Sequence, residues 1–415
     1  MLQEFIDKNF YRLLLFTLIF GVIFYDTIGF AYTDEICSLI LFILYLKYIF
    51  STPKWEINKM FIITTAVFLF YLFYSFYINS NTKAGIITDF VIQYKPYLGF
   101  FCVYAIKPRI SPVYKKLICE ICIVLGFYLL GIGILYLVYP DSIKYTLKHP
   151  SRLATAVSIV SLLYLYCSNF TEKDKIIFVL LLLTGMFSAR SKFYGFFIIS
   201  VALLIFTSHS SKIKINFKTI TLLSITALLV IAFTYKKINL YFLGGGDFVR
   251  YDEKIQDTIA RAALYFYSTD VFIDFFPFGS GFASYATYAS GIYYSDIYNI
   301  YGLDNIYGLT KGDAAFISDT YYPALAQFGI VGVILFFTFW GNLGIQTLKK
   351  YRISPKDALL ALMIIIFFLI ECTSDSTITH NRGLFMMMLL GLILSDLKRA
   401  QNNYQTKVTI NKSHG

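Results

Sequence analysis

Long apolar segments separated by short basic loops run through almost the whole sequence, and they constrain the fold more than any other feature. A helix needs about 20 mostly apolar residues to cross the hydrocarbon core of a bilayer. Hydrophobic residues make up 57% of the 415 residues and charged residues only 15%. That balance is too apolar for a soluble domain. The sequence therefore predicts an all-α integral membrane protein that crosses the bilayer many times.

Segments of suitable length and composition predict about twelve transmembrane helices. They lie at 11–30, 35–51, 60–79, 88–106, 116–139, 152–170, 175–189, 192–207, 217–235, 320–347, 357–372 and 383–397. The two short segments 175–189 and 192–207 could instead form one helix interrupted at Arg190, which would invert everything after it. The basic loops around them favour two helices.

Basic clusters in the short loops set the orientation, because such loops stay in the cytoplasm. With twelve spans, all of them fall on one side: Lys54 and Lys59, Lys107 to Lys116, Lys173 and Lys175, Lys212 to Lys218, Lys349 to Lys356, and Lys398 with Arg399. Both termini are then cytoplasmic. The net charge of +11 is thus a topology signal that also favours contact with anionic membrane lipids, and it implies no nucleic-acid partner.

A polar segment rich in Tyr, Asp and Gly interrupts the apolar pattern after the ninth predicted helix and should lie outside the membrane. The predicted divisions are transmembrane helices in 1–235, a large outer loop in 236–318, further helices in 319–397 and a cytoplasmic tail in 398–415. We expect the chemistry of the protein in and around this loop.

Arginine departs from the lysine pattern, because most arginines fall on the outer side. These are Arg152, Arg190, Arg250, Arg261 and Arg382. A guanidinium is a planar, permanently charged fork that binds phosphate or carboxylate through two hydrogen bonds. An anionic ligand at the outer boundary is therefore predicted. Contact with lipid headgroups is the preferred explanation for Arg152 and Arg250, while Arg250 stays a candidate substrate contact.

Three short motifs surround the outer loop. Ser188-Ala189-Arg190-Ser191-Lys192 forms a hairpin that places two cations at the outer boundary. Arg261 opens a segment, 260–275, with apolar residues at helical spacing, which runs into the turn Phe276-Pro277-Phe278-Gly279-Ser280-Gly281-Phe282. The third motif runs from Ser318-Asp319-Thr320-Tyr321-Tyr322-Pro323 to Gly329-Ile330-Val331-Gly332.

In this order the motifs resemble those of the O-antigen polymerase and O-antigen ligase superfamily. Its pattern is an arginine that opens a loop helix, then Pro-x-Gly-x-Gly, then a polar site before a helix with Gly-hydrophobic-hydrophobic-Gly. The motifs are short, but the twelve-span plan with one large outer loop extends the similarity over most of the chain. The resemblance implies a glycosyltransferase of the bacterial inner membrane with a periplasmic active site, and a chain-length regulator as a further partner.

One departure distinguishes the two branches of that superfamily. The ligase branch has a His-Asn pair before the helix, with the histidine as the proposed catalytic residue. Counting back from Gly329, those positions hold Ser318 and Asp319 here. Of the four histidines, only His149 and His380 fall in predicted outer loops. The missing histidine favours a polymerase, and a ligase that transfers glycan to a lipid A-core acceptor is the alternative.

A polymerase of this kind is thought to move a growing glycan from its polyprenyl-pyrophosphate carrier onto a sugar of the incoming lipid-linked unit. Arg190 and Arg261 suit the pyrophosphate, whose developing charge must be neutralised. Asp319 is the candidate base for the acceptor hydroxyl, although an Asp before an apolar helix is equally well explained as a helix cap. The further predicted substrate contacts are Arg382, Lys192, Tyr321 and His380.

Lys95 and Glu371 lie inside predicted spans, where a charge marks a functional or internally paired site. Lys95 is therefore a further candidate substrate contact in a groove for the lipid carrier. The same two charges support a transporter as an alternative function, and a structural or receptor role is a third.

The carboxylates of the outer loop are scattered without metal-ligand spacing, so we expect no metal and no cofactor. The loop tyrosines form another candidate feature. A sugar groove can be built from tyrosine rings and their hydroxyl groups, although tyrosine also favours membrane interfaces. The candidates are Tyr285, Tyr288, Tyr293, Tyr294, Tyr298, Tyr301 and Tyr307.

Overall fold

The computed structural model describes residues 2–28, 32–52, 58–209, 221 and 256–413. In these residues the chain forms α-helices, short 3-10 helices and one π-helical segment, and no β-strand. The predicted all-α class is confirmed for this part of the chain. The predicted span 217–235 and the candidate residue Arg250 lie outside it.

The first half of the chain consists of long helices joined by short turns. They are α1 (Leu2–Phe16) with its π-helical continuation η1 (Thr17–Ile23), α2 (Tyr25–Ile28), α3 (Thr33–Ser51), α4 (Lys59–Ile78), α5 (Lys83–Ile106), α6 (Pro112–Val138), α7 (Ser142–Thr146), α8 (Pro150–Cys167), α9 (Glu172–Leu183), η2 (Thr184–Ser188) and α10 (Ser191–His209). Side chains that accept hydrogen bonds from the first turn begin α4, α5 and α6; they belong to Asn58, Thr82 and Ser111.

The second half begins with the described part of the outer loop and ends with three long helices. The elements are α12 (Gln256–Asp274), α13 (Tyr288–Ile292), α14 (Ile297–Ile300), η5 (Leu303–Asn305), η6 (Pro323–Phe328), α15 (Gly329–Lys350), α16 (Pro355–Glu371), η7 (Thr377–Thr379) and α17 (Asn381–Ser413). Helix α17 continues past the predicted end of its span at 397. Except for 217–235, every predicted span overlaps one of the described helices.

Four stretches of described helix are long and apolar enough to cross a membrane: α4, α6, α8 and the stretch Pro323–Lys350, which joins η6 to α15. A shorter apolar helix, Ser191–Phe206, lies in α10. The faces of α4 and α6 are largely open, with Phe73 67% and Phe127 69% exposed. Apolar faces of this size fit a lipid surround better than water. The protein is thus compatible with a membrane location.

The structure decides one open helix boundary and corrects another. Helices α9 and α10 are separate, because Ala189 adopts a left-handed conformation with φ 52° between them, so the single interrupted helix does not form. The predicted helix at 320–347 begins later, at Gly329, and a 3-10 segment precedes it. Gly329 itself has φ 59°, which separates the two segments.

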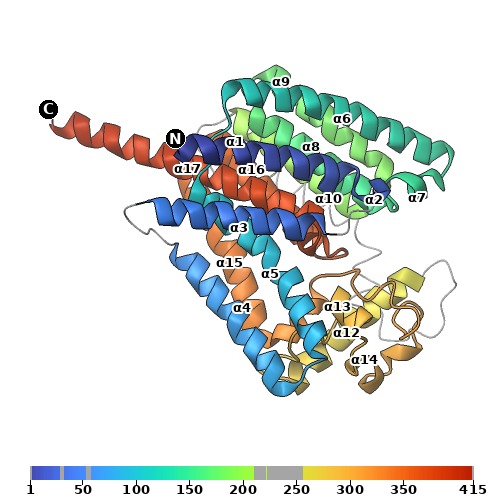
Figure 1. The fold of residues 1–415 in the computed structure, drawn as a ribbon. Coiled ribbons are helices and arrows are strands. Elements are labelled where there is room, and N and C mark those ends of the chain that lie inside the picture. Colours follow the sequence, from blue (N-terminus) through green and yellow to red (C-terminus); the bar gives the residue numbers. More distant parts are fainter. Residues whose placement is uncertain (1, 29–31, 53–57, 210–220, 222–255, 414–415) are drawn as a thin grey trace.

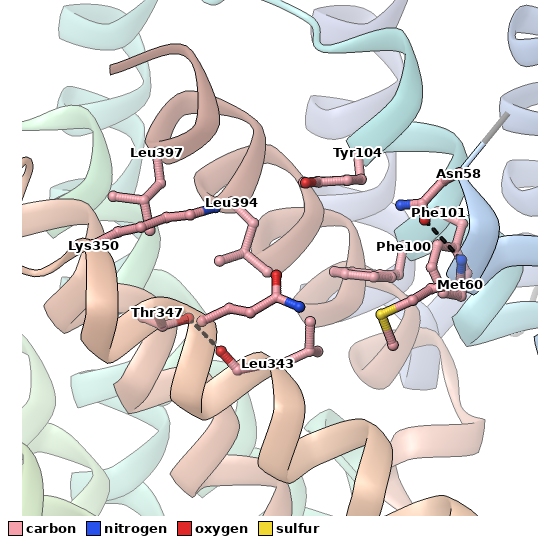
Figure 2. Close-up of a pocket in the computed structure, with 11 residues that line it drawn as sticks. Asn58, Met60, Phe100, Phe101, Tyr104, Leu343, Thr347, Lys350, Leu394 and Leu397 are labelled. Atoms are coloured by element: carbon pink, nitrogen blue, oxygen red, sulfur yellow. Dashed lines mark hydrogen bonds between the residues drawn. The ribbon is translucent and has the colours of Figure 1, made fainter. Parts of the chain in front are cut away.

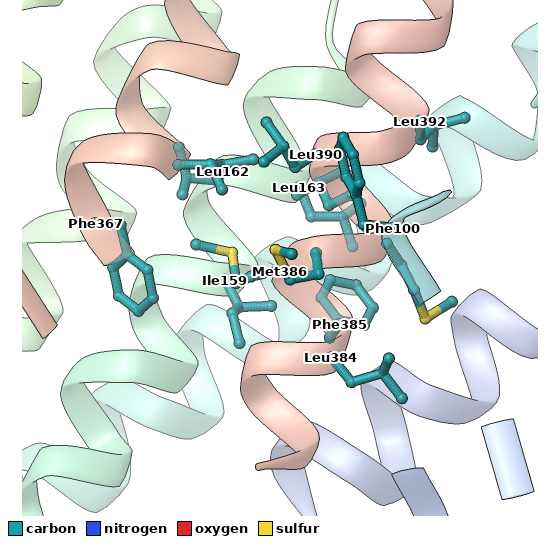
Figure 3. Packing of buried hydrophobic residues seen from close by; sticks show 14 of the residues in the cluster. Phe100, Ile159, Leu162, Leu163, Phe367, Leu384, Phe385, Met386, Leu390 and Leu392 are labelled. Carbon is teal, nitrogen blue, oxygen red and sulfur yellow. The ribbon is translucent and has the colours of Figure 1, made fainter. Parts of the chain in front are cut away.

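The main core is formed around α8, α16 and α17. Helix α8 is apolar or small on all sides, and 94% of its length is buried, as expected for a helix enclosed by others. Figure 3 shows Leu162 and Ile159 of α8 facing Met386 and Leu390 of α17, with Phe367 of α16 beside them.

The N-terminus and the end of α17 lie on one side of the molecule, and helices α12, α13 and α14 lie at the other end (Figure 1). The outer-loop helices form a second, smaller core that includes Leu264, Val271, Leu303 and Leu309. Tyr285 and Tyr298 are fully buried in it, and the Tyr285 hydroxyl donates to the Leu264 carbonyl at 2.6 Å. These two tyrosines are therefore packing residues rather than sugar-binding plates, which corrects that part of the prediction.

Candidate functional site at the outer ends of the helices

The two glycine motifs of the sequence meet in the structure. Gly279 and Gly281 have φ 82° and 84°, and Gly281 N donates to Gln327 O at 2.8 Å. A Cβ on Gly279 would lie 2.2 Å from Gly329 N, and one on Gly329 would lie 2.3 Å from Pro277 O. Only glycines allow this approach of two backbones. The turn after α12 thereby fixes the start of α15.

The hairpin between α4 and α5 holds the same turn from the other side. Ser75 Oγ accepts from Phe282 N at 2.7 Å, and Asp89 Oδ2 accepts from Ala283 N at 2.7 Å. Ser80 Oγ donates to Phe282 O at 2.8 Å. Asp89 is fully buried, and the sequence analysis missed it. The sequence feature that could have identified Asp89 is a carboxylate inside a predicted apolar span. A charge in such a place usually has a partner within the protein.

Arg261 and Asp319 form an ion pair at the end of the outer loop. Arg261 lies in the first half of α12, and its Nη2 is 2.6 Å from Asp319 Oδ2. The arginine side chain is 8% exposed and the aspartate 31% exposed. Helix η6 begins at Pro323 with Tyr322 at its N-cap and no capping side chain. Asp319 therefore pairs with Arg261 and does not cap the following helix, which corrects the capping alternative.

The loop between α16 and α17 is joined to both ends of the outer loop. Ser376 Oγ donates to Ser318 O at 2.6 Å and lies 3.2 Å from His380 Nε2. The hydroxyl of Tyr265, on α12, donates to Thr373 O at 2.8 Å. These bonds bring His380, a predicted substrate contact, next to the chain that carries Asp319.

Arg190 lies against His149, the residue that precedes α8. Arg190 Nη2 is 2.9 Å from His149 Nε2. A guanidinium only donates, so Nε2 is the acceptor and the ring is neutral. The pKa of His149 is lowered to about 4, chiefly by burial and then by the charge of Arg190; Asp375 opposes this shift, and Arg261 and Lys192 add to it. Of the predicted phosphate-binding residues, Arg190 thus contacts His149, and the charge of Arg261 also acts on this histidine.

Lys192 is neutralised by two carboxylates of neighbouring elements. Its Nζ lies 2.7 Å from Glu371 Oε2 and 2.8 Å from Asp375 Oδ2. Lys192 and Glu371 are 6% and 5% exposed. Burial alone would raise the pKa of Asp375, but Lys192 holds it well below its usual range. Lys192 therefore joins α10 to the α16–α17 loop, and the predicted substrate contact has a structural partner.

Arg382 is also engaged within the protein. Its Nη2 lies 2.8 Å from Asp26 Oδ2 and donates to Val22 O at 2.9 Å, and Arg152 pairs with the same aspartate. Arg382 and Asp26 are 7% and 1% exposed. Arg382 therefore has internal partners in this structure, and its contact with phosphate stays a prediction.

Lys95 likewise has internal partners. Its Nζ pairs with Asp34 and lies 2.7 Å from Glu35 Oε1, both at the start of α3. Lys95 is buried and does not line any of the apolar grooves beside α4. Of the two explanations considered for this lysine, internal pairing agrees with the structure and a place in a carrier groove does not.

An apolar groove of about 300 Å³ runs between α4 and α15. Tyr321, a predicted substrate contact, lines it together with Tyr71, Tyr97, Phe328 and Phe336. Tyr321 follows Asp319 by two residues, and its ring is 4% exposed. One end of the groove is thus formed by the segment that follows Asp319, and the groove continues between α4 and α15.

A second, much smaller pocket lies near the opposite end of α15 (Figure 2). Its volume is about 40 Å³, and Met60, Leu343, Thr347 and Lys350 are among the residues that line it. Helix α15 separates Lys350 from Gly329 by roughly 30 Å. This pocket is therefore remote from the charged residues at the outer end.

No group of three His, Cys, Asp or Glu side chains in the described part of the chain is arranged to hold a metal ion. No model of a known protein family matches the sequence, and no curated protein is significantly similar to it. The functional conclusion therefore depends on the chemistry of the outer-end residues.

Proposed function

We propose that this protein is a membrane glycosyltransferase that polymerises lipid-linked glycan units, as an O-antigen or surface polysaccharide polymerase does. The observation that carries the proposal is the contact of Arg190 with His149, a histidine whose pKa the charge of Arg261 also lowers, together with the pairing of Asp319 and Arg261. Four separate segments of the chain supply these groups. Positioned cations of this kind suit an anionic leaving group better than a neutral substrate.

The reaction requires the protein mainly to supply positive charge and to position the two substrates. A sugar on a polyprenyl pyrophosphate is already activated, so the protein must neutralise the departing pyrophosphate and hold the acceptor hydroxyl in line. Arg190 and Arg261 carry permanent charge and offer several donors each. In this proposal they contact the pyrophosphate, and Asp319 keeps Arg261 in place between turnovers. Polyprenyl-pyrophosphate-linked glycans are the substrates on both sides of the reaction, and neither a metal nor a cofactor takes part.

The groove between α4 and α15 favours a substrate with a lipid tail. Its volume of about 300 Å³ lies at the lower end of the range for ligand sites, and its lining is almost entirely apolar. A prenyl chain in this groove would place its pyrophosphate near Tyr321 and the Arg261–Asp319 pair. A soluble sugar nucleotide has no lipid tail that could bind in this groove.

The internal pairing of the buried charges speaks against a transporter. Transport sites use intramembrane charges that a substrate or ion can engage. Lys95 pairs with Asp34 and Glu35, and Glu371 pairs with Lys192. The carboxylate of Asp319 is paired as well, with Arg261, but it is partly exposed at the outer end, where an extended glycan would have access.

The proposal includes a location and topology. Twelve spans in the inner membrane of a bacterium, with both termini cytoplasmic, would put α12 and the outer-end residues in the periplasm, where lipid-linked units are joined. A chain-length regulator would contact the protein from that side.

Glycans from a strain that lacks the protein test the proposal first. Single repeat units on the surface anchor would indicate a polymerase. Long chains that accumulate on the lipid carrier, with a bare anchor, would indicate a ligase, and an unchanged ladder would contradict both.

Complementation then tests the arginines. Arg190→Ala and Arg261→Ala should restore membrane-inserted protein but no chain extension. Arg352→Ala, which removes an exposed arginine in the loop between α15 and α16, should restore the full ladder. Wild-type chain lengths with both outer-end variants would remove the pyrophosphate contact from the proposal.

A further inference from the structure

A histidine is connected through one serine to the chain that carries Asp319, although the sequence motif lacks a histidine. We propose that the base of the reaction is His380, acting through Nδ1, and that Ser376 is its positioning residue. This inference rests on the proposed function and replaces Asp319 as the residue that takes the acceptor proton. It follows from two hydrogen bonds and one exposed ring.

The hydrogen bonds of Ser376 determine which ring nitrogen can act as a base. A backbone carbonyl only accepts, so the single hydroxyl proton of Ser376 points to Ser318 O, 2.6 Å away. The same hydroxyl oxygen lies 3.2 Å from His380 Nε2 and must therefore accept there. Nε2 then carries the ring proton, and Nδ1 of the neutral ring carries the lone pair. Within the described residues, no group donates a hydrogen bond to Nδ1.

The place of the ring suits a reacting base. His380 is exposed, whereas Ser376 is 7% exposed and Thr377 and Thr379 are also buried. The serine is thus fixed inside the loop and the histidine faces outward from it. Ser376 donates to the carbonyl of Ser318, the residue before Asp319, so Ser376 links His380 to the chain that carries Asp319. A nucleophile, a base and an orienting group in a chain of hydrogen bonds is the usual arrangement for activating a hydroxyl.

Desolvation and, to a smaller extent, three nearby cations lower the pKa of His380 and keep its ring neutral. Its pKa is lowered, first by the desolvation of its surroundings and then by Lys95 on α5, Arg152 on α8 and Arg382 on α17. Asp375, in the same loop, acts in the opposite direction. The neutral ring is the form that can accept a proton, and Asp375 stabilises the imidazolium that forms afterwards.

Asp319 is less suited to this step. Its Oδ2 already lies 2.6 Å from Arg261 Nη2, and proton transfer to the carboxylate would weaken that ion pair while pyrophosphate charge develops nearby. A base that is separate from the arginine avoids this conflict. Asp319 is then a positioning residue for Arg261.

The step balances without a further reactant. The acceptor oxygen forms a bond to the anomeric carbon of the donor glycan, and the bond from that carbon to the pyrophosphate oxygen breaks. The electron pair leaves with the pyrophosphate, which Arg190 and Arg261 neutralise. The acceptor proton moves to His380 Nδ1 and is later lost to water at the outer surface.

Rate measurements on the purified full-length protein, with a lipid-linked repeat unit as substrate, test this inference. His380→Gln should lower kcat by about 10²- to 10⁴-fold with little change in KM. It should also abolish the fall in rate that the wild-type enzyme shows at acidic pH. Imidazole in the buffer should restore part of the rate of His380→Ala, an effect that a structural role would not give.

Two serine variants in one loop supply the matched comparison. Ser376→Ala should lower kcat but keep the acid limb of the pH profile, because the base is present but misplaced. Ser374→Ala removes a hydroxyl two residues away and should leave the rate unchanged.

The outcomes separate this inference from the proposed function. Turnover and a pH profile like those of the wild type in His380→Gln would overturn the assignment of the base while the polymerase stands. Absence of any polymerisation by the wild-type protein would overturn the proposed function itself.

Discussion

Asp319 Oδ2 lies 2.6 Å from Nη2 of Arg261, 58 residues earlier in the chain. The pair joins α12 of the outer loop to the segment that leads into α15. It also holds a partly exposed carboxylate against a nearly buried guanidinium. The outer loop is therefore fixed on the membrane helices by charge as well as by the glycine contact of Gly279 with Gly329.

This pair predicts non-additive kinetics. Arg261→Lys keeps a charge but loses the planar fork, so we expect an intermediate rate between those of the wild type and Arg261→Ala. Asp319→Asn should lower the rate by releasing Arg261, and in the Arg261→Ala background it should cost little more. Initial rates of the four members of this double-mutant cycle measure the coupling. Fully additive losses would show that the two residues act independently.

Lys192 predicts a large stability effect, because its removal leaves two carboxylates unpaired. Lys192→Ala should lower the free energy of unfolding by about 3–5 kcal/mol. The melting temperature of the detergent-solubilised protein measures it. Lys144→Ala is the matched control. The side chains of Lys144 and its partner Asp141 are 70% and 81% exposed, so loss of their ion pair should not change the melting temperature measurably. Recovery of the melting temperature when Glu371→Gln and Asp375→Asn are added to Lys192→Met would confirm the cause.

The close contact between Gly279 and Gly329 predicts that one added methyl group would detach the outer loop from the helices. Gly279→Ala places a Cβ 2.2 Å from Gly329 N at a positive φ, so we expect a loss of more than about 2 kcal/mol in stability. Gly312→Ala has open space within 4 Å and should be close to neutral. Limited proteolysis of the outer loop compares the two variants. Equal resistance to protease would contradict the docking of the turn.

His149 predicts a specific acid sensitivity. Its pKa is about 4 in the folded protein, through burial and the charge of Arg190, and 6.5 ordinarily. Between these values the unfolded chain binds a proton that the folded protein does not, so stability is complete above pH 6.5 and falls as the pH drops towards 4. The loss is at most about 3 kcal/mol. Melting temperatures across this range should fall less steeply for His149→Gln; identical slopes would remove His149 as the source.

Much of the architecture could be predicted because span length and apolar composition are local properties of the chain. Helix α12 and the glycine turn could likewise be predicted. The helical spacing and the Pro-x-Gly-x-Gly motif each depend only on residues close together in the sequence. The start of α15 was not, because apolar residues before Gly329 continue the pattern that a helix would have. Only the positive φ at Gly329, which the contact with Gly279 requires, ends it there.

The site residues divide in the same way. The sequence by itself predicted that Arg190 and Asp319 lie near the ends of apolar spans and that Arg261 opens a helix of the outer loop, because residue type and distance along the chain are enough for that. It did not determine that Asp26 forms an ion pair with Arg382, that Asp34 and Glu35 form ion pairs with Lys95, or that Ser376 orients His380. Those pairings join residues as many as 356 positions apart. The tertiary structure alone decides them, because the partner of a buried charge depends on which helices pack together.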